Sequence, residues 1–244
     1  MHSRILPRAV ILAAGDGGRL RGRTQLLAKP LLPLNGRPII SYTLDALALA
    51  GIRDVVVVTG YHEGQIRTAL AEGHQDLAIS FVSNPCFEGG ASLSLTAARD
   101  ACGAEPFLLL MADHVLSAAL IRRLILAFVA DPAKCYVAAD ACLRDPVFTD
   151  EATKLALAAD GSSRVTAIGK MLCAWQTLDA GAFALTVDVW AAAAAMPEDC
   201  ELSVIMAELA RRQLLYAADV SGACWYDIDT EADLLAASAM LETL

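Results

Sequence analysis

The chain has 244 residues and a formal net charge of −9 at pH 7, with an isoelectric point near 4.9. We do not expect so acidic a chain to bind nucleic acid or anionic membranes non-specifically, because phosphate contacts need a basic face. Its apolar runs are far shorter than the roughly 18 residues of a membrane span, so no membrane span is expected.

The cysteine pattern indicates the compartment. Seven cysteines occur, an odd number with no C-x-x-C pair, and the four histidines are scattered. This pattern favours reduced thiols in a reducing compartment over disulfides or a zinc site. The first eight residues contain two arginines and no apolar core, so no signal peptide is visible. We therefore expect a cytoplasmic protein.

A strand followed by a glycine-rich loop begins the sequence pattern. The apolar run 9–14 predicts a buried strand, and three glycines and two cations come after it: Gly15, Gly17, Gly18, Arg19 and Lys29. The glycines can turn tightly and bring backbone N–H groups close to a ligand. Together with the cations they suit a polyphosphate. An ordinary strand-to-helix turn is the alternative.

Two other glycine-loop motifs do not match. The dinucleotide fingerprint G-x-G-x-x-G needs a third glycine where this chain has Leu20. A P-loop needs Gly-Lys-Ser or Gly-Lys-Thr, and neither occurs in the sequence. An NAD-dependent dehydrogenase is therefore the least favoured of the enzyme classes.

Strands and helices alternate over the first 141 residues. Strands are expected at 9–14, 54–61, 77–83, 106–113 and 134–141, and helices at 38–50, 62–72, 92–101 and 117–130. This alternation predicts βαβ units, an α/β fold and a mainly parallel sheet. We expect Ser117 to cap the last of these helices, and Ser92 is a candidate cap for the helix that follows it.

The pattern changes after residue 143. Short apolar segments at 153–160, 164–170 and 180–186 predict a small antiparallel or mixed β lobe, about 145–186, over the edge of the sheet. Helices are then expected at 188–196 and 201–212, with a strand at 214–220. Thr230 and Asp233 form a variant capping box for a final helix. We expect one domain, 1–244, with an inserted lobe.

Three carboxylates follow strands or extended segments. Asp113 ends an apolar strand, at the sheet edge where α/β proteins bind ligands. Asp227 and Asp229 are two residues apart, so in an extended segment they share a face. Close carboxylates repel one another, and a divalent cation such as Mg²⁺ turns this repulsion into binding. A turn cap for Asp113 and a solvated loop for the pair are the alternatives. The glycine-rich loop with its two cations and an Mg²⁺ site at these carboxylates together describe an enzyme that acts at the α-phosphate of a nucleoside triphosphate.

Four segments together resemble a known superfamily. LAAGDGGRL, KPLLPLNGRPII, MADH and WYDIDTEADL resemble the motifs of sugar-nucleotide pyrophosphorylases and nucleotidyltransferases. The resemblance implies a Rossmann-like, mostly parallel or mixed sheet flanked by helices. It implies that the catalytic residues are Arg19, Lys29 and Asp113, and that the Mg²⁺ ligands are Asp113, Asp227 and Asp229. The nucleotide contacts that it implies are Ala13, Ala14, Gly15, Gly17, Gly18, Arg19, Lys29, Gly60, Asn84 and Ser92.

A narrower resemblance concerns the second substrate. Residues 151–183 resemble the inserted lobe of inositol-1-phosphate cytidylyltransferases. By position, the implied acceptor-binding residues are Lys154, Lys170 and Asp179, and His114 is a further candidate. Two lysines suit a phosphomonoester that carries close to two negative charges. Exposed strand lysines and a structural histidine are the alternatives. Ala180 stands where the family pattern has Thr.

The favoured function is Mg²⁺-dependent transfer of a cytidylyl group from CTP to a phosphorylated alcohol, with inositol 1-phosphate favoured. The products would be a CDP-alcohol and pyrophosphate. Alternatives are a sugar-1-phosphate nucleotidyltransferase that uses UTP, GTP or dTTP, and a choline-phosphate or phosphonate cytidylyltransferase. A catalytically silent nucleotide-binding module is the non-enzyme alternative. The sequence does not fix the oligomeric state, and a homodimer is compatible with it.

Overall fold

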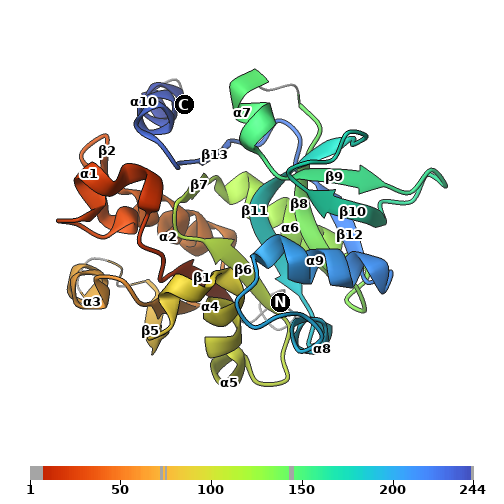
Figure 1. Ribbon diagram of the computed structural model, residues 1–244, viewed down its shortest axis with the longest axis horizontal. Helices are drawn as coiled ribbons and strands as arrows, with labels where there is room; N and C mark the ends of the chain where they lie inside the picture. Colours follow the sequence, from red (N-terminus) through yellow and green to blue (C-terminus); the bar gives the residue numbers. More distant parts are fainter. Residues whose placement is uncertain (1–7, 72–73, 75, 143–145, 243–244) are drawn as a thin grey trace.

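The computed structural model describes residues 8–71, 74, 76–142 and 146–242 (Figure 1). The expected helix end at 72 and the expected start of the lobe at 145 lie outside these residues, as do the first seven residues. Within the described part, none of the helices is both long and apolar enough to cross a bilayer.

Nine strands of the described residues form one mixed sheet. They are β1 (Arg8–Ala13), β4 (Asp54–Thr59), β5 (Ala78–Ser83), β6 (Phe107–Met111), β8 (Cys135–Asp140), β9 (Lys154–Leu157), β10 (Val165–Gly169), β11 (Thr177–Leu185) and β12 (Leu215–Asp219). Seven follow the order β10-β9-β11-β6-β1-β4-β5, while β8 pairs with β11 and β12. Pairs β1/β4, β1/β6, β4/β5 and β8/β12 are parallel.

Two short two-stranded sheets lie beside the large one. The strand β7 (His114–Leu116) pairs with β13 (Trp225–Asp227), and β2 (Pro33–Leu34) pairs with β3 (Arg37–Pro38). The β7/β13 pairing places Asp227 opposite His114. It therefore joins the segment after β6 to the C-terminal part of the described chain.

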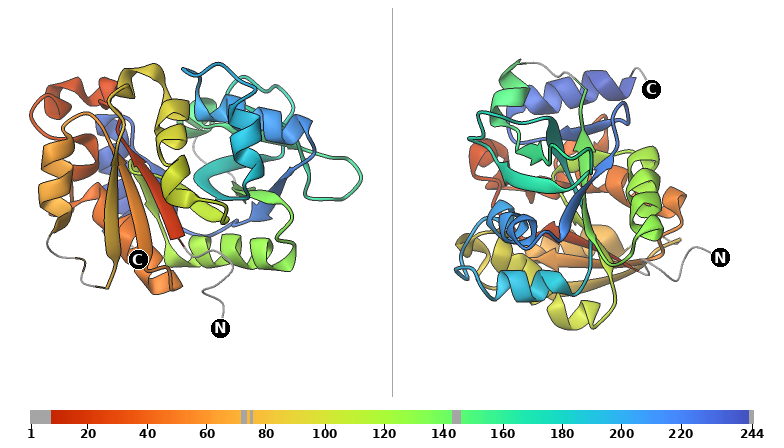
Figure 2. Two further views of the ribbon diagram at one scale, coloured as in Figure 1. Left: turned by 90° about the horizontal axis from the view of Figure 1, so that it is seen from below. Right: turned by 90° about the vertical axis from the view of Figure 1, so that its right-hand side faces the viewer.

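Helices cover both faces of the large sheet (Figure 2). Apolar residues of α2 (Ile39–Ala50), α3 (Glu63–Ala71) and α6 (Ala118–Ala130) share one core cluster. A second cluster contains residues of α4 (Ala91–Ala97), α5 (Arg99–Cys102), α8 (Asp188–Ala193) and α9 (Leu202–Arg211). The remaining helices are α1 (Arg21–Thr24), α7 (Pro146–Glu151) and α10 (Glu231–Glu242), with 3₁₀ turns η1 (Gly18–Leu20), η2 (Lys29–Leu31) and η3 (Phe87–Gly89). The predicted α/β fold is confirmed.

The central strands β1, β4 and β6 are apolar along most of their length because both of their faces are covered. In β1, Ala9 and Ile11 pack into the first core cluster, and Val10 and Leu12 pack into the second. All four side chains are at most 5% exposed. The sheet therefore holds the loops at its carboxyl edge on a rigid base.

One expected element is assigned differently by the structure. The segment 180–186, expected in the inserted lobe, lies in β11 up to Leu185, and β11 pairs antiparallel with β6 in the large sheet. An apolar run does not distinguish a lobe strand from a central strand, because both bury their side chains. The hairpin β9/β10 is antiparallel, as expected, and continues the same sheet.

Two of the predicted caps are confirmed and one is wrong. Ser117 Oγ accepts a hydrogen bond from Leu120 N, and Thr230 and Asp233 exchange backbone-to-side-chain hydrogen bonds. Helix α4, however, begins after Gly90, and the hydroxyl of Ser92 donates to the carbonyl of Glu198 instead. Ser92 therefore ties α4 to the segment before α9.

We predict that Ser117→Ala lowers the free energy of unfolding by about 1 kcal/mol, because an N–H in the first turn of α6 loses its acceptor. Urea denaturation with circular dichroism measures this loss. Ser117→Asn keeps a capping oxygen and should stay within a few tenths of a kcal/mol of the wild type. Equal losses in both variants would contradict the capping role.

Candidate active site

The glycine loop, residues 14–20, packs directly on Lys29. Gly17 has φ +65°, and a Cβ at this position would lie 2.9 Å from Thr24 Cγ2 and 3.0 Å from Lys29 Cβ. The backbone N–H of Gly18 donates to Asp16 Oδ1 and fixes the turn into η1. Glycine is therefore required at position 17, both for its conformation and for its small size.

The ammonium group of Lys29 is buried between two carboxylates. Its Nζ lies 2.6 Å from Asp113 Oδ2 and 2.8 Å from Asp229 Oδ1, and the side chain is 8% exposed. Burial alone would lower the pKa of Lys29, but the two carboxylates outweigh it and raise the pKa well above its ordinary value. Lys29 is a fixed positive charge at the carboxyl edge of the sheet.

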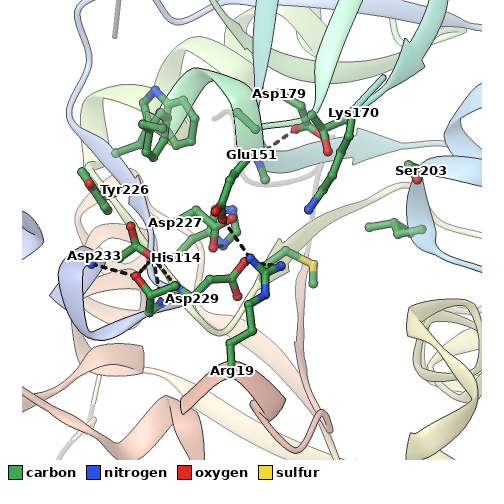
Figure 3. Close-up of a pocket in the computed structure, with 18 of the residues that line it drawn as sticks. Arg19, His114, Glu151, Lys170, Asp179, Ser203, Tyr226, Asp227, Asp229 and Asp233 are labelled. Carbon is green, nitrogen blue, oxygen red and sulfur yellow. Dashed lines mark hydrogen bonds and ion pairs between the residues drawn. The ribbon is translucent and has the colours of Figure 1, made fainter. Parts of the chain in front are cut away.

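Arg19 connects the glycine loop to two other segments. Its guanidinium lies 2.9 Å from Glu151 Oε2 at the end of α7 and 3.0 Å from Asp229 Oδ2 (Figure 3). The side chain is 51% exposed, so these contacts are screened by solvent and are individually weak. Arg19 can therefore exchange them for an anionic ligand at small cost.

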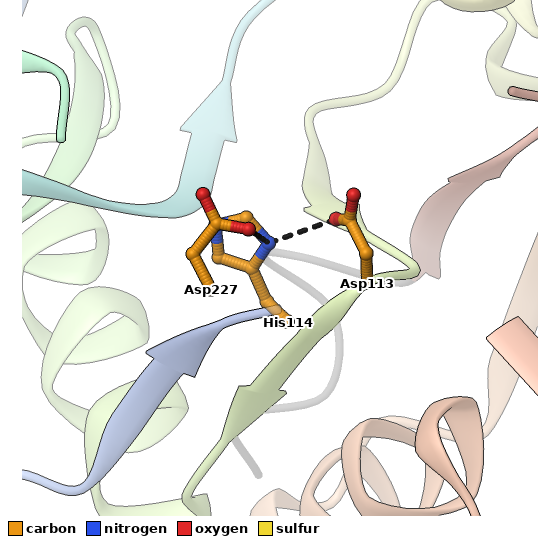
Figure 4. A group of neighbouring side chains, drawn as sticks. All are labelled: Asp113, His114 and Asp227. Atoms are coloured by element: carbon orange, nitrogen blue, oxygen red, sulfur yellow. Dashed lines mark hydrogen bonds and ion pairs between the residues drawn. The ribbon is translucent and has the colours of Figure 1, made fainter. Parts of the chain in front are cut away.

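Asp113, His114 and Asp227 form a carboxylate–histidine cluster (Figure 4). His114 Nδ1 lies 2.9 Å from Asp113 Oδ1 and 3.6 Å from Asp227 Oδ1. One ligand atom from each residue lies within 4.8 Å of the others. Asp113 follows β6, His114 begins β7 and Asp227 ends β13, so the β7/β13 pairing assembles the cluster.

The cluster shifts the pKa values of its members. Burial opposes the ionised form of Asp113, but Lys29 and His114 outweigh it and hold the pKa of Asp113 far below its usual range. Burial raises the pKa of Asp227 to about 6. Burial alone would lower the pKa of His114, but Asp227, Asp113 and Asp179 raise it to about 9.

The donor set of this cluster fits a divalent cation. Asp227 Oδ1 is buried and accepts no hydrogen bond from the described residues, so it has unused binding capacity. The two carboxylates are suitable oxygen ligands for such an ion, and His114 lies beside them. The sequence predicted Asp229 as the third ligand, whereas the structure brings His114 to the carboxylates and places Asp229 on Lys29 and Arg19.

An apolar cluster underneath holds these charged residues in place. It joins the residues after β1 to β7 and to α10, and its members are Leu20, Leu32, Leu34, Ile39, Val115, Ile228, Leu234 and Ala237. Leu20 follows Arg19, Val115 follows His114, and Ile228 separates the two aspartates of the C-terminal motif. Burial of these neighbours fixes the backbones from which the charged side chains extend.

A cavity of about 820 Å³ opens beside the cluster. Arg19, Asp227 and Asp229 line one side, and Lys170 and Asp179 line the side formed by β10 and β11. Lys170 points into the cavity (Figure 3) and forms no ion pair with any described residue. The cavity therefore offers a cation opposite the glycine loop that has no ion-pair partner among the described residues.

Two of the residues predicted to bind the acceptor substrate, Asp179 and Lys154, differ in their surroundings. Asp179 Oδ1 accepts a hydrogen bond from Gly181 N at 2.8 Å, and burial raises the pKa of Asp179 to about 7. The ammonium of Lys154 is buried and donates to the carbonyls of Asp150, Ala152 and Lys170. Asp179 lines the cavity, while Lys154 ties α7 to β10.

Two of the predicted nucleotide contacts, Gly60 and Asn84, follow β4 and β5. A Cβ at Gly60 would lie 2.9 Å from the carbonyl oxygen of Asn84 and 3.0 Å from Ala14 Cβ, so three predicted nucleotide contacts lie close together. Ala13 and Ala14 are at most 3% exposed and offer only backbone atoms. The side chain of Asn84 donates to Ser94 Oγ and accepts from Cys86 N, which fixes the turn after β5.

Sequence reasoning missed several residues of the cavity wall. They are Phe148, Glu151, Gly181, Trp225 and Tyr226, and the ring of Phe148 contacts those of Trp225 and Tyr226. Glu151 precedes an apolar segment and carries no pattern of its own. The Asp179-Ala-Gly181 tripeptide was the one signal that pointed near Gly181.

These features define an α/β fold with a glycine-rich loop, a buried lysine and a carboxylate–histidine cluster at one sheet edge. A family model described as a MobA-like NTP transferase domain matches residues 9–174, more than half of the chain. The chain belongs to the MobA-like NTP transferase family.

Individual relatives narrow the comparison. The chain is 30% identical over 230 residues to the bifunctional IPC transferase and DIPP synthase of Aquifex aeolicus, covering 93% of this chain and 50% of that protein. The chain thus spans about half the length of this relative. It is 37% identical over 138 residues to the CMP-5'-(3-aminopropyl)phosphonate synthase of Streptomyces rubellomurinus, covering 56% of this chain and 21% of that protein.

A solved structure shares the whole fold. The structure of the inositol-1-phosphate CTP transferase from T. maritima superposes with a TM-score of 0.82 at 21% identity, covering 98% of this chain and 97% of that one. The sheet, the flanking helices and the lobe hairpin therefore belong to a common architecture.

The raised pKa of His114 predicts a pH-dependent stability. Its folded pKa of about 9 exceeds the ordinary 6.5, so its contribution is fully present below pH 6.5 and is lost as the pH rises through 9. With a chelator present, the difference in unfolding free energy between wild type and His114→Gln should shrink over this window by about 3 kcal/mol. Urea titrations at several pH values measure it.

His62→Gln, which alters a histidine outside the cluster, is the control for the substitution itself. A difference between wild type and His114→Gln that is independent of pH would contradict the charged state of His114.

Proposed function

We propose that the protein transfers a cytidylyl group from CTP to inositol 1-phosphate, giving a CDP-alcohol and pyrophosphate. The observation that carries this proposal is the cavity itself. Arg19 and Asp229 face it from the glycine-loop side, the cluster contributes His114 and Asp227, and Lys170 faces it from the lobe. Two phosphate-binding sides converge on one group of cation ligands.

The glycine-loop side suits the triphosphate. Backbone N–H groups of the loop and the charges of Arg19 and Lys29 would hold the β- and γ-phosphates. Binding would draw Arg19 from Glu151 and Asp229, contacts that solvent already weakens. The same two cations would stabilise the charge that develops on the leaving pyrophosphate.

The cluster suits the divalent cation of this reaction. Asp113 and Asp227 would hold Mg²⁺, with His114 beside them. The bound ion would supply charge neutralisation at the phosphates. The chain's own residues would make the remaining contribution to catalysis: they would position the phosphates and exclude bulk water.

The acceptor side requires no general base. A phosphate oxygen of the acceptor is already anionic, and it would form the new bond to the α-phosphorus while the bond from that phosphorus to the β-phosphate oxygen breaks. Lys170 would hold the acceptor phosphate in line for this attack. Asp179 would accept hydrogen bonds from the hydroxyls of the polyol.

The comparisons support this choice of substrates. The relative that spans nearly all of this chain is named an IPC transferase, and the T. maritima structure is that of an inositol-1-phosphate CTP transferase. One observation favours a second acceptor class, an aminoalkyl phosphonate. The aromatic side chains of Phe148 and Tyr226 line the cavity near Glu151, and such a wall can bind an amine through cation–π contact.

A pyrophosphate-release assay tests the proposal. CTP, UTP, GTP and dTTP are each combined with inositol 1-phosphate, aminoethylphosphonate, choline phosphate or glucose 1-phosphate, with Mg²⁺ present. We expect release with CTP and inositol 1-phosphate, and loss of at least about 100-fold in kcat for Asp113→Ala, because the cluster loses a carboxylate. Release with glucose 1-phosphate alone would refute the acceptor, and near-normal turnover of the variant would refute the metal assignment.

Lys170 gives a prediction specific to the acceptor. Lys170→Ala should raise KM for the acceptor phosphate by about 10-fold or more while KM for CTP stays within about twofold, since one charge-assisted contact is lost. Steady-state kinetics with each substrate varied measures both constants. Lys134→Ala removes a lysine paired with Asp131 outside the cavity and should change neither. Equal rises in both constants would count against an acceptor-side Lys170.

A further inference from the structure

The strand β11 carries an irregularity beside the cluster. In its pairing with β8, Asp179 lies opposite Ala139 and Phe183 lies opposite Val137, so four steps along β11 match two along β8. The extra residues form a bulge, and Gly181 within it has φ +72°. Bulges of this kind re-aim side chains next to active sites.

Gly181 makes two contacts from the bulge. Its N–H donates to Asp179 Oδ1 at 2.8 Å, on the acceptor side of the cavity. On the other side, a Cβ at Gly181 would lie 2.3 Å from both Cδ2 and Nε2 of His114. Real side chains do not approach so closely, so the imidazole occupies space that only a glycine leaves open.

The ring of His114 has no room to retreat. Its Nδ1 edge faces Asp113 at 2.9 Å and Asp227 at 3.6 Å. Its backbone is anchored as well, because the buried Thr43 hydroxyl donates to the carbonyl of His114 at 2.8 Å. Any side chain at position 181 would therefore push the ring toward the two carboxylates.

We propose that Gly181 is a positioning residue. Because it has no side chain, it fixes the position of the His114 ring and, through the ring, the spacing of Asp113 and Asp227. Its N–H orients the carboxylate of Asp179 toward the acceptor side of the cavity. Gly181 thereby couples the cation ligands to the acceptor wall. The inference rests on the proposed function in so far as the cluster holds the divalent cation of the reaction.

Mn²⁺ binding tests this role without relying on turnover. Electron paramagnetic resonance of free Mn²⁺ gives the affinity of wild type and of Gly181→Ala for this ion. Gly181→Ala should bind Mn²⁺ at least about 10-fold more weakly, because a loss of this size is typical when a residue that orients metal ligands is altered. Gly161→Ala is the matched control, since Gly161 has φ +77° and nothing within 4 Å of its Cβ position. Its affinity should stay within about twofold of wild type.

A double-mutant cycle separates collision from backbone strain. If Gly181 acts through the imidazole, adding Gly181→Ala to His114→Ala should weaken Mn²⁺ binding no further. Should Gly181→Ala alone fail to fold by circular dichroism, the double variant should regain a folded state, because the collision is absent from it. Weakening that adds independently of His114, or a double variant that is equally unfolded, would overturn the proposal.

Two further outcomes separate this inference from the proposed function. If the wild type binds no Mn²⁺, or if Gly181→Ala binds it like Gly161→Ala, the positioning role is refuted whatever the protein's substrates are. If no nucleotide and acceptor support pyrophosphate release by the wild type, the proposed function fails, and the Mn²⁺ cycle still decides the role of Gly181.

Discussion

The site depends on one buried ammonium group. Lys29 lies between Asp113 and Asp229, which follow it by 84 and 200 residues in the chain, and the side chain is 8% exposed. A charge so buried is tolerated because both carboxylates compensate it, and removing one partner from such an arrangement is strongly destabilising. The interaction therefore fixes the glycine loop, the end of β6 and the C-terminal motif relative to one another.

An apolar layer gives this electrostatic arrangement its precision. Leu20, Val115, Ile228 and Leu234 are each at most 6% exposed and meet in one cluster. Three of them directly adjoin charged residues of the site, so hydrophobic burial determines where the charges stand. Ion pairs on flexible backbones would be weak, whereas pairs extending from a packed layer keep their geometry.

The sequence predicted the parts of the molecule that have a strong local signal. Apolar runs identified β1 and β6, and the motif residues Asp113 and Asp229 meet at the expected sheet edge. Contacts between distant segments had no such signal. The two-residue spacing of Asp227 and Asp229 predicted that they share a face, but it could not show that Asp227 and not Asp229 lies beside His114. No local pattern linked Arg19 to Glu151, which is 132 residues away. The burial of Lys154 was equally invisible, because its partners are backbone carbonyls.

The wide separation of Lys29 and Asp229 along the chain has a consequence during protein synthesis. Ribosomes add about 5–20 residues per second, so roughly 10–40 s pass between the addition of Lys29 and that of Asp229. Strands β1, β4 and β6 are complete well before then and can already pair in parallel. The nascent chain can thus pair these three strands before its full set of site charges is present, so a chain that lacks Asp229 has part of the sheet but no assembled site.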